Sequence, residues 1–137
     1  MSGRVGLPIA LLSGLLLVAA TAESRSRLAP ADEYFGRFRM SPLEITNRIN
    51  DAERRGASYR GLVNTQDAIE DWTAKYPDDP WIASREYRMS RLFAHLRSAD
   101  GNAEAGHCRA FLREHFPGTS YSVAAERDDR AGAKHVA

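Results

Sequence analysis

Cysteine is scarce in this sequence, and its scarcity excludes several kinds of protein. Cys108 is the single cysteine in 137 residues, so no internal disulfide can form. No C-x-x-C, C-x-x-C-H or H-E-x-x-H run is present. Cys108 and His115 would share a helix face, but they lie two turns apart, which is too far for one metal ion. The sequence therefore gives no support to a metal, a haem or any other cofactor.

A surplus of charge of one sign is also missing. The chain has 19 Lys and Arg against 18 Asp and Glu, and the first 22 residues contain one charged side chain, Arg4. Without those residues the two signs are equal in number. Proteins that bind nucleic acid draw much of their affinity from a surplus of Lys and Arg. We therefore expect no nucleic-acid partner.

Motifs of nucleophilic and phosphate chemistry are absent as well. There is no G-x-S-x-G turn and no glycine-rich phosphate loop. Acidic doublets such as Glu70-Asp71 diverge by about 100° on a helix, so they seldom direct two carboxylates at one substrate. Asp78 and Asp79 are accounted for by turn and cap positions. We predict a protein without catalytic activity; the alternative is a small secreted hydrolase or ligand-binding helical protein.

The longest apolar run is too short for a comfortable membrane span. Leu7 to Ala20 form 14 uncharged residues, preceded by Arg4 and followed by Ala20-Thr21-Ala22. A spanning helix needs about 20 apolar residues. The pattern is typical of a cleaved signal peptide over residues 1–22, with an uncleaved signal anchor as the alternative. No cysteine follows the run, which excludes a lipid anchor there. We expect an exported protein, periplasmic or secreted, without a stable membrane span after cleavage.

The first part of the remaining chain combines a polar segment with a well-marked helix start. Residues 23–41 are predicted to be a flexible segment that contains an aromatic cluster. Ser41-Pro42-Leu43-Glu44 then forms a capping box with proline at the first helical position. Ile45, Ile49 and Ala52 follow on one face, and Gly56 suits the end of a helix over 42–55.

Proline and apolar spacing predict four more helices. They are expected from Asn64 or Thr65 to Tyr76, and over 80–96, 103–116 and 120–125, with residues 98–102 as a turn. The charged, alanine-rich tail 127–137 is predicted to be disordered. No stretch alternates with strand period. These features predict an all-α fold with one helical domain over 42–126, built as a small antiparallel bundle or an array of helical hairpins.

A sequence pattern recurs at a spacing of 40 residues. Each copy is a helix that ends in aromatic-Pro, a short turn, and an aromatic residue that opens the next helix. The first copy contains Ala68, Trp72, Tyr76, Pro77 and Trp81, and the second Leu112, Phe116, Pro117, Ser120 and Tyr121. This pattern resembles the tetratricopeptide-like helical repeats of exported bacterial envelope proteins, although their usual spacing is 34 residues and Cys108 replaces the small alanine in the second copy.

Arg85 interrupts the apolar arc of the third predicted helix, between Trp81, Met89 and Leu92. A buried guanidinium needs a partner, because an unpaired buried charge is strongly destabilising. Two interpretations stay open. Arg85 forms an internal ion pair with Asp71 or Asp67, or it lines a groove that receives an acidic group of a partner.

The aromatic cluster before the first helix is the second candidate binding element. Tyr34, Phe35 and Phe38 lie close to Arg37 and Arg39 in the sequence, a composition that suits interaction hot spots. The cluster either docks onto the helices as a lid or anchors a partner. Together these features predict an exported, non-catalytic helical protein that binds an envelope protein or peptide through a groove with aromatic and Arg side chains. A purely structural accessory subunit is a third possibility.

Overall fold

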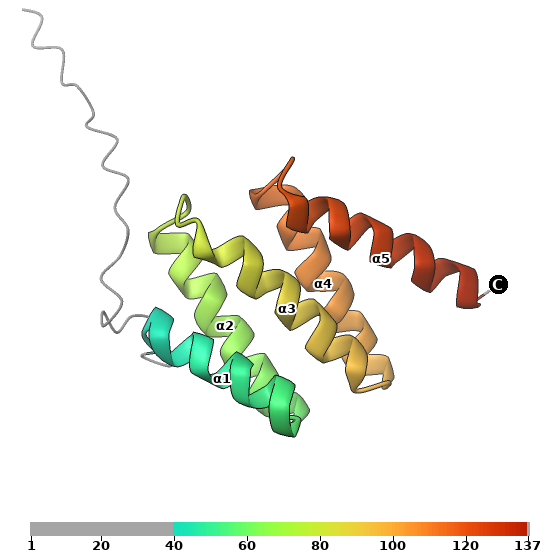
Figure 1. Ribbon diagram of the computed structural model, residues 1–137, viewed down its shortest axis with the longest axis horizontal. Coiled ribbons are helices and arrows are strands. Elements are labelled where there is room, and N and C mark those ends of the chain that lie inside the picture. Colours follow the sequence, from blue (N-terminus) through green and yellow to red (C-terminus); the bar gives the residue numbers. More distant parts are fainter. Residues whose placement is uncertain (1–39, 137) are drawn as a thin grey trace, which may run out of the picture.

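The computed structural model describes residues 40–136, which form five α-helices joined by short turns (Figure 1). The all-α prediction is confirmed. The helices are α1 (Pro42–Arg55), α2 (Tyr59–Lys75), α3 (Trp81–His95), α4 (Ala99–His115) and α5 (Ser120–Val136). The predicted signal peptide and the predicted segment up to residue 39, with Tyr34, Phe35 and Phe38, lie outside the described residues.

Helix α3 is the centre of the fold. It packs against all four other helices, with α1 on one side, α5 on the other, and α2 and α4 in a second layer behind (Figure 1). The connections span only a few residues, so consecutive helices run antiparallel. This arrangement gives α3 an inner face toward α2 and α4 and an outer face beside α1.

The main core joins the first four helices. Ile45 and Ile49 of α1, Trp72 of α2 and Phe93 of α3 are fully buried there. A smaller cluster, Ala83, Leu112 and Ala125, connects α3 and α4 to α5. The predicted serine cap of α1 is confirmed, since the Glu44 N–H donates to Ser41 Oγ over 3.2 Å. The Glu44 carboxylate accepts from Arg48 and does not complete the predicted capping box.

Two helices begin earlier than predicted, because serine caps were overlooked. Ser58 Oγ accepts from the Gly61 N–H and starts α2 at Tyr59, and Ser98 Oγ accepts from the Gly101 N–H and starts α4 at Ala99. The predicted turn over 98–102 assumed that Gly101 breaks the helix, but Gly101 lies within α4. A Cβ atom at that position would lie 2.6 Å from the Phe93 carbonyl oxygen, so glycine allows α4 to approach the end of α3.

The prediction of a disordered tail was wrong for residues 127–136, which continue α5 as helix. The cause is tertiary. Asp129 accepts hydrogen bonds from both Arg109 and Arg113 of α4, and Asp128 accepts one from the Tyr87 hydroxyl over 3.1 Å. Alanine favours helix wherever such contacts supply an anchor. The charged composition of the tail therefore reflects pairing with α4 rather than solvation alone.

Candidate binding groove

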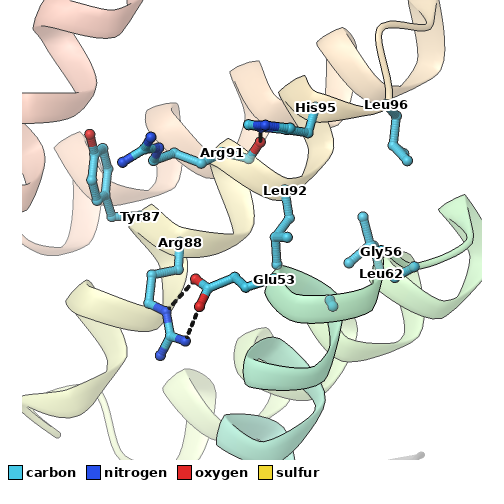
Figure 2. Close-up of a pocket in the computed structure, with 11 residues that line it drawn as sticks. Glu53, Gly56, Leu62, Tyr87, Arg88, Arg91, Leu92, His95 and Leu96 are labelled. Carbon is cyan, nitrogen blue, oxygen red and sulfur yellow. Dashed lines mark hydrogen bonds and ion pairs between the residues drawn. The ribbon is translucent and has the colours of Figure 1, made fainter.

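A groove of about 540 Å³ lies where the end of α1 and the start of α2 meet the outer face of α3 (Figure 2). Its floor is apolar and consists of Ala52, Ala57, Leu62, Leu92 and Leu96. Its rim carries polar and charged side chains, namely Glu53, Tyr87, Arg88, Arg91 and His95. The groove therefore combines an apolar floor with charged side chains at its edge.

Local sequence features place these side chains. Gly56 adopts a φ of +79°, which favours glycine, and it ends α1 so that the chain turns back into α2. The turn sets Leu62 beneath the last turn of α1. On α3, Arg88, Arg91 and His95 follow at intervals of three and four residues, so they share one helical stripe. Leu92 and Leu96 lie next to that stripe and form the floor.

Arg88 closes one side of the groove through an ion pair to α1. Its Nε donates to Glu53 Oε1 over 2.7 Å and its Nη2 to Glu53 Oε2 over 2.6 Å, as Figure 2 shows. Nη2 also donates to Asn50 Oδ1 over 2.6 Å. These hydrogen bonds hold the pKa of Glu53 below its usual value. Since both charges are satisfied internally, this pair fixes α1 against α3 and adds no net charge to the groove.

Arg91 is the remaining fixed charge at the rim. Its side chain is exposed, and among residues 40–136 it forms no ion pair with a carboxylate. His95 stands one turn further along, with Nδ1 3.3 Å from the Arg91 carbonyl oxygen. The charge left over at this rim is therefore positive. An anionic group bound beside the apolar floor would meet an available guanidinium.

The predicted site residue Arg85 lies one turn before this groove and not in its lining. Its Nη1 donates to Ser84 Oγ over 2.7 Å, its Nε reaches Thr46 Oγ1 at 3.4 Å, and its guanidinium stands 5.9 Å from the Trp81 ring centre. Within the described part of the chain it forms no ion pair. The expected pair with Asp71 or Asp67 is therefore not formed, because the half-buried Arg85 lies at the α1 boundary and contacts Thr46 there.

Glu86 is an acidic residue that α3 buries on its inner face, and it was not among the predicted site residues. Ile82, Glu86, Met89 and Phe93 follow at helical spacing, and all four are fully buried. The signal was present in the sequence, since Glu86 falls four residues after Ile82 and three before Met89. Arg85 follows Trp81 at the same four-residue interval, so the sequence alone places it on the same arc. Trp81, however, lies only partly buried at the edge of the core.

Asp79 also has a different role from the predicted one. The N-cap residue of α3 is Pro80, and no side chain forms a capping hydrogen bond at this helix start. Asp79 is buried, and its Oδ2 accepts a hydrogen bond from Trp72 Nε1 over 3.2 Å. The carboxylate therefore anchors the indole at the α2–α3 corner.

Other chemistry finds little support in the described region. Burial raises the pKa of the Cys108 thiol, so it stays protonated and is a poor nucleophile. Among residues 40–136 no three His, Cys, Asp or Glu side chains gather as a metal site would require. In the same range, no helix combines the length and apolar character needed to cross a membrane. No protein-family model matches the chain, and no curated protein or solved structure matches it.

Proposed function

We propose that this protein is an exported, non-catalytic binding module that holds an acidic, amphipathic segment of an envelope protein in the groove between α1 and α3. The observation that carries the proposal is the combination of a continuous apolar floor with an arginine at the rim, Arg91, that forms no ion pair among residues 40–136. Apolar side chains of the segment would cover Leu62, Leu92 and Leu96. A flanking carboxylate would bind Arg91.

The shape of the site favours a segment of protein over a small compound. The groove is bounded by helices rather than enclosed, and its polar groups stand at its border, with the Glu53–Arg88 pair on one side of Leu92 and Arg91 and His95 on the other (Figure 2). An amphipathic segment can match such a border along its length, because its apolar and acidic side chains alternate between two faces. A compact ligand would leave much of the floor open to water.

The location and the repeat belong to the same proposal. The apolar run from Leu7 to Ala20 and the Ala20-Thr21-Ala22 site support export. Two corners of the fold support kinship with tetratricopeptide-like hairpins. Tyr76 ends α2 with φ −130° and ψ 69°, and Phe116 ends α4 with φ −132° and ψ 50°. Both N–H groups donate to the carbonyl four residues earlier, so the two aromatic-Pro corners share one backbone geometry.

A binding titration with a designed peptide tests the groove. The purified protein is titrated with a fluorescein-labelled peptide that has leucines at helical spacing flanked by glutamates, and binding is followed by anisotropy. A peptide with lysine in place of each glutamate is the control for charge. We expect the acidic peptide to bind, the basic one to bind far more weakly, and the difference to shrink at high salt.

Charge reversal at the rim locates the site. Arg91→Glu should weaken binding of the acidic peptide about tenfold or more, or about 1.4 kcal/mol, and should improve binding of the basic peptide. Arg60→Glu, an exposed arginine of α2 outside the groove, is the matched control and should change little. Equal losses in both variants would indicate general attraction to charge and contradict the groove. Binding of laurate in the absence of binding by either peptide would favour a small-molecule site instead.

A further inference from the structure

A buried acid on the inner face of α3 forms the inner end of a polar chain that reaches the surface. Glu86 is fully buried, and its Oε1 accepts from Gln66 Nε2 over 2.5 Å. Gln66 Nε2 also lies 3.2 Å from Glu70 Oε1, and His107 Nε2 lies 2.6 Å from that same oxygen. Glu70 and His107 are both partly exposed. Hydrogen bonds therefore connect the core carboxyl to solvent through two side chains of α2 and one of α4.

Among residues 40–136, no Lys or Arg side chain acts on Glu86. From α2 it faces Gln66 and the carboxylate of Glu70, and from α4 it faces the thiol of Cys108, with Glu104 and His107 further out. No Lys or Arg of the described chain favours its charged form. The charged groups of α1 and α5 meet α3 elsewhere, for Glu53 binds Arg88 and Asp128 binds Tyr87.

A neutral acid suits this place far better than a carboxylate. Burial raises the pKa of Glu86 to about 8, and the negative charge of Glu70 adds to the rise, while the hydrogen bond from Gln66 and the nearby Cys108 thiol oppose it. The second oxygen, Oε2, is buried without a hydrogen-bond partner among the described residues, as is Gln66 Oε1. Ionisation would leave charge on these unsatisfied atoms in a dry interior.

We propose that Glu86 is an interior proton-binding site, and that loss of its proton loosens the packing of α3 on α2 and α4. With the proton bound, the junction is closed and neutral. Without it, the carboxylate is repelled by Glu70 and draws water toward the core along the Gln66–Glu70–His107 chain. Because α3 also carries Arg88 and Arg91 on its outer face, the same proton would tighten the binding groove. This last link rests on the function proposed above.

The direction of the pH effect follows from the shifted acid. Unfolded chains release the Glu86 proton near its ordinary pKa of 4.5, whereas the folded protein holds it until about 8. The folded state therefore binds the extra proton between these values. The contribution of Glu86 to the free energy of unfolding is therefore full below pH 4.5. It declines as the pH rises and is lost above about pH 8.

Thermal unfolding of the purified protein across this range tests the proton site. The melting temperature should fall from about pH 5 to about pH 8 and then level off. Glu86→Gln keeps the shape and the amide contact but cannot ionise, so it should remove most of this decline. Glu114→Gln, an exposed acid of α4, is the matched control and should keep it. An unchanged decline in Glu86→Gln, or no decline in the native protein, would overturn the proposal.

A direct titration protects the test against a variant that folds poorly. In the native protein with ¹³C-labelled glutamate, one carboxyl resonance should titrate far above the others and be missing in Glu86→Gln or Glu86→Met. If every glutamate titrates near its ordinary pKa, the proposal is wrong.

The groove is examined separately, with the acidic peptide between about pH 7 and about pH 9, where an ordinary histidine is mostly neutral. Binding by the native protein should weaken over this range, and binding by Glu86→Gln should not. If the peptide binds with the same pH profile in both proteins, the link to the groove is wrong and the proposed function stands. If no peptide binds while the unfolding results hold, the proposed function fails and the proton site stands.

Discussion

The two faces of α3 place a glutamate in opposite surroundings. One glutamate, on the outer face, is paired with an arginine, and the other, on the inner face, has no Lys or Arg beside it among residues 40–136. On the outer face, Glu53 of α1 receives two hydrogen bonds from Arg88 at a partly exposed boundary, and its pKa is lowered. On the inner face, Glu86 lies in a dry core beside the Gln66 amide and the Cys108 thiol, and its pKa is raised to about 8. The same type of residue is thus an anion at one interface of α3, as Glu53, and a neutral acid at the other, as Glu86.

This contrast gives the two interfaces opposite responses to acid. The Glu53–Arg88 pair contributes stability above the ordinary pKa of glutamate, and the contribution is lost as the pH falls through the lowered value. The Glu86 site contributes most below the ordinary value and loses its contribution as the pH rises. Variants on each face should therefore separate the two effects, and the expected losses of stability run from large in the core to none at the exposed Arg91.

The largest effect is expected where the inner face is most densely packed. Phe93 is fully buried, and its ring stands 6.2 Å from that of Tyr59 in an edge-on contact. Phe93→Ala removes this volume and leaves a cavity, so we expect unfolding free energy to fall by about 3–5 kcal/mol. Chemical denaturation measures this loss. A loss below about 1 kcal/mol would show that the inner face does not carry the fold.

A smaller effect is expected from the amide that supports the buried acid. Gln66→Leu removes the hydrogen bond to Glu86 Oε1 and should cost about 1–3 kcal/mol, because a buried polar group is left unsatisfied. Since that hydrogen bond lowers the pKa of Glu86, the variant should also shift the high-pH end of the decline upward. Melting curves at several pH values measure both. Thr65→Val, which loses a bond within α2 alone, is a control that should leave the pH profile unchanged.

The ion pair of the outer face should contribute less. Glu53→Gln weakens both hydrogen bonds from Arg88, and because these side chains are partly exposed we expect a loss of only about 0.5–1 kcal/mol near neutral pH. The difference from the native protein should vanish as the solution is acidified below the pKa of Glu53. A difference that persists in acid would indicate lost packing rather than a lost charge pair.

No stability change is expected from Arg91, the rim residue without an ion pair among residues 40–136. Arg91 is exposed and forms no ion pair within residues 40–136, so Arg91→Ala should leave the free energy of unfolding within about 0.5 kcal/mol of the native value. The same variant should weaken binding of the acidic peptide. A clear loss of stability would place Arg91 in the structural framework and remove the main support for the groove.

The all-α fold was predictable because its signals are local. The Ser41 cap, the spacing of Ile45 and Ile49, and the prolines after Tyr76 and Phe116 each act within a few residues. What failed depended on distant partners. The helical tail requires Arg109 and Arg113 to meet Asp129, and nothing in the alanine-rich sequence after residue 126 reveals that contact.

The binding groove was not predictable for the same reason. It exists because Gly56 brings α2 back beneath α1 and because Arg88 is held by Glu53, 35 residues away in the sequence. Glu86 could have been found from its spacing to Ile82 and Met89. Its state as a neutral acid could not, because that depends on the absence of a cation on α2 and α4 in the described region.

The close approach at Gly101 sets a limit on how this sequence can diverge. Any side chain there would collide with the backbone at the end of α3, and Ser98 must remain three residues earlier to cap α4. Mutational drift can therefore replace most of the surface while the Ser98 and Gly101 pair stays fixed. Distant homologues with the same α3–α4 turn should carry this S-x-x-G signature even after overall identity has faded, which makes it a landmark for tracing the lineage of the fold.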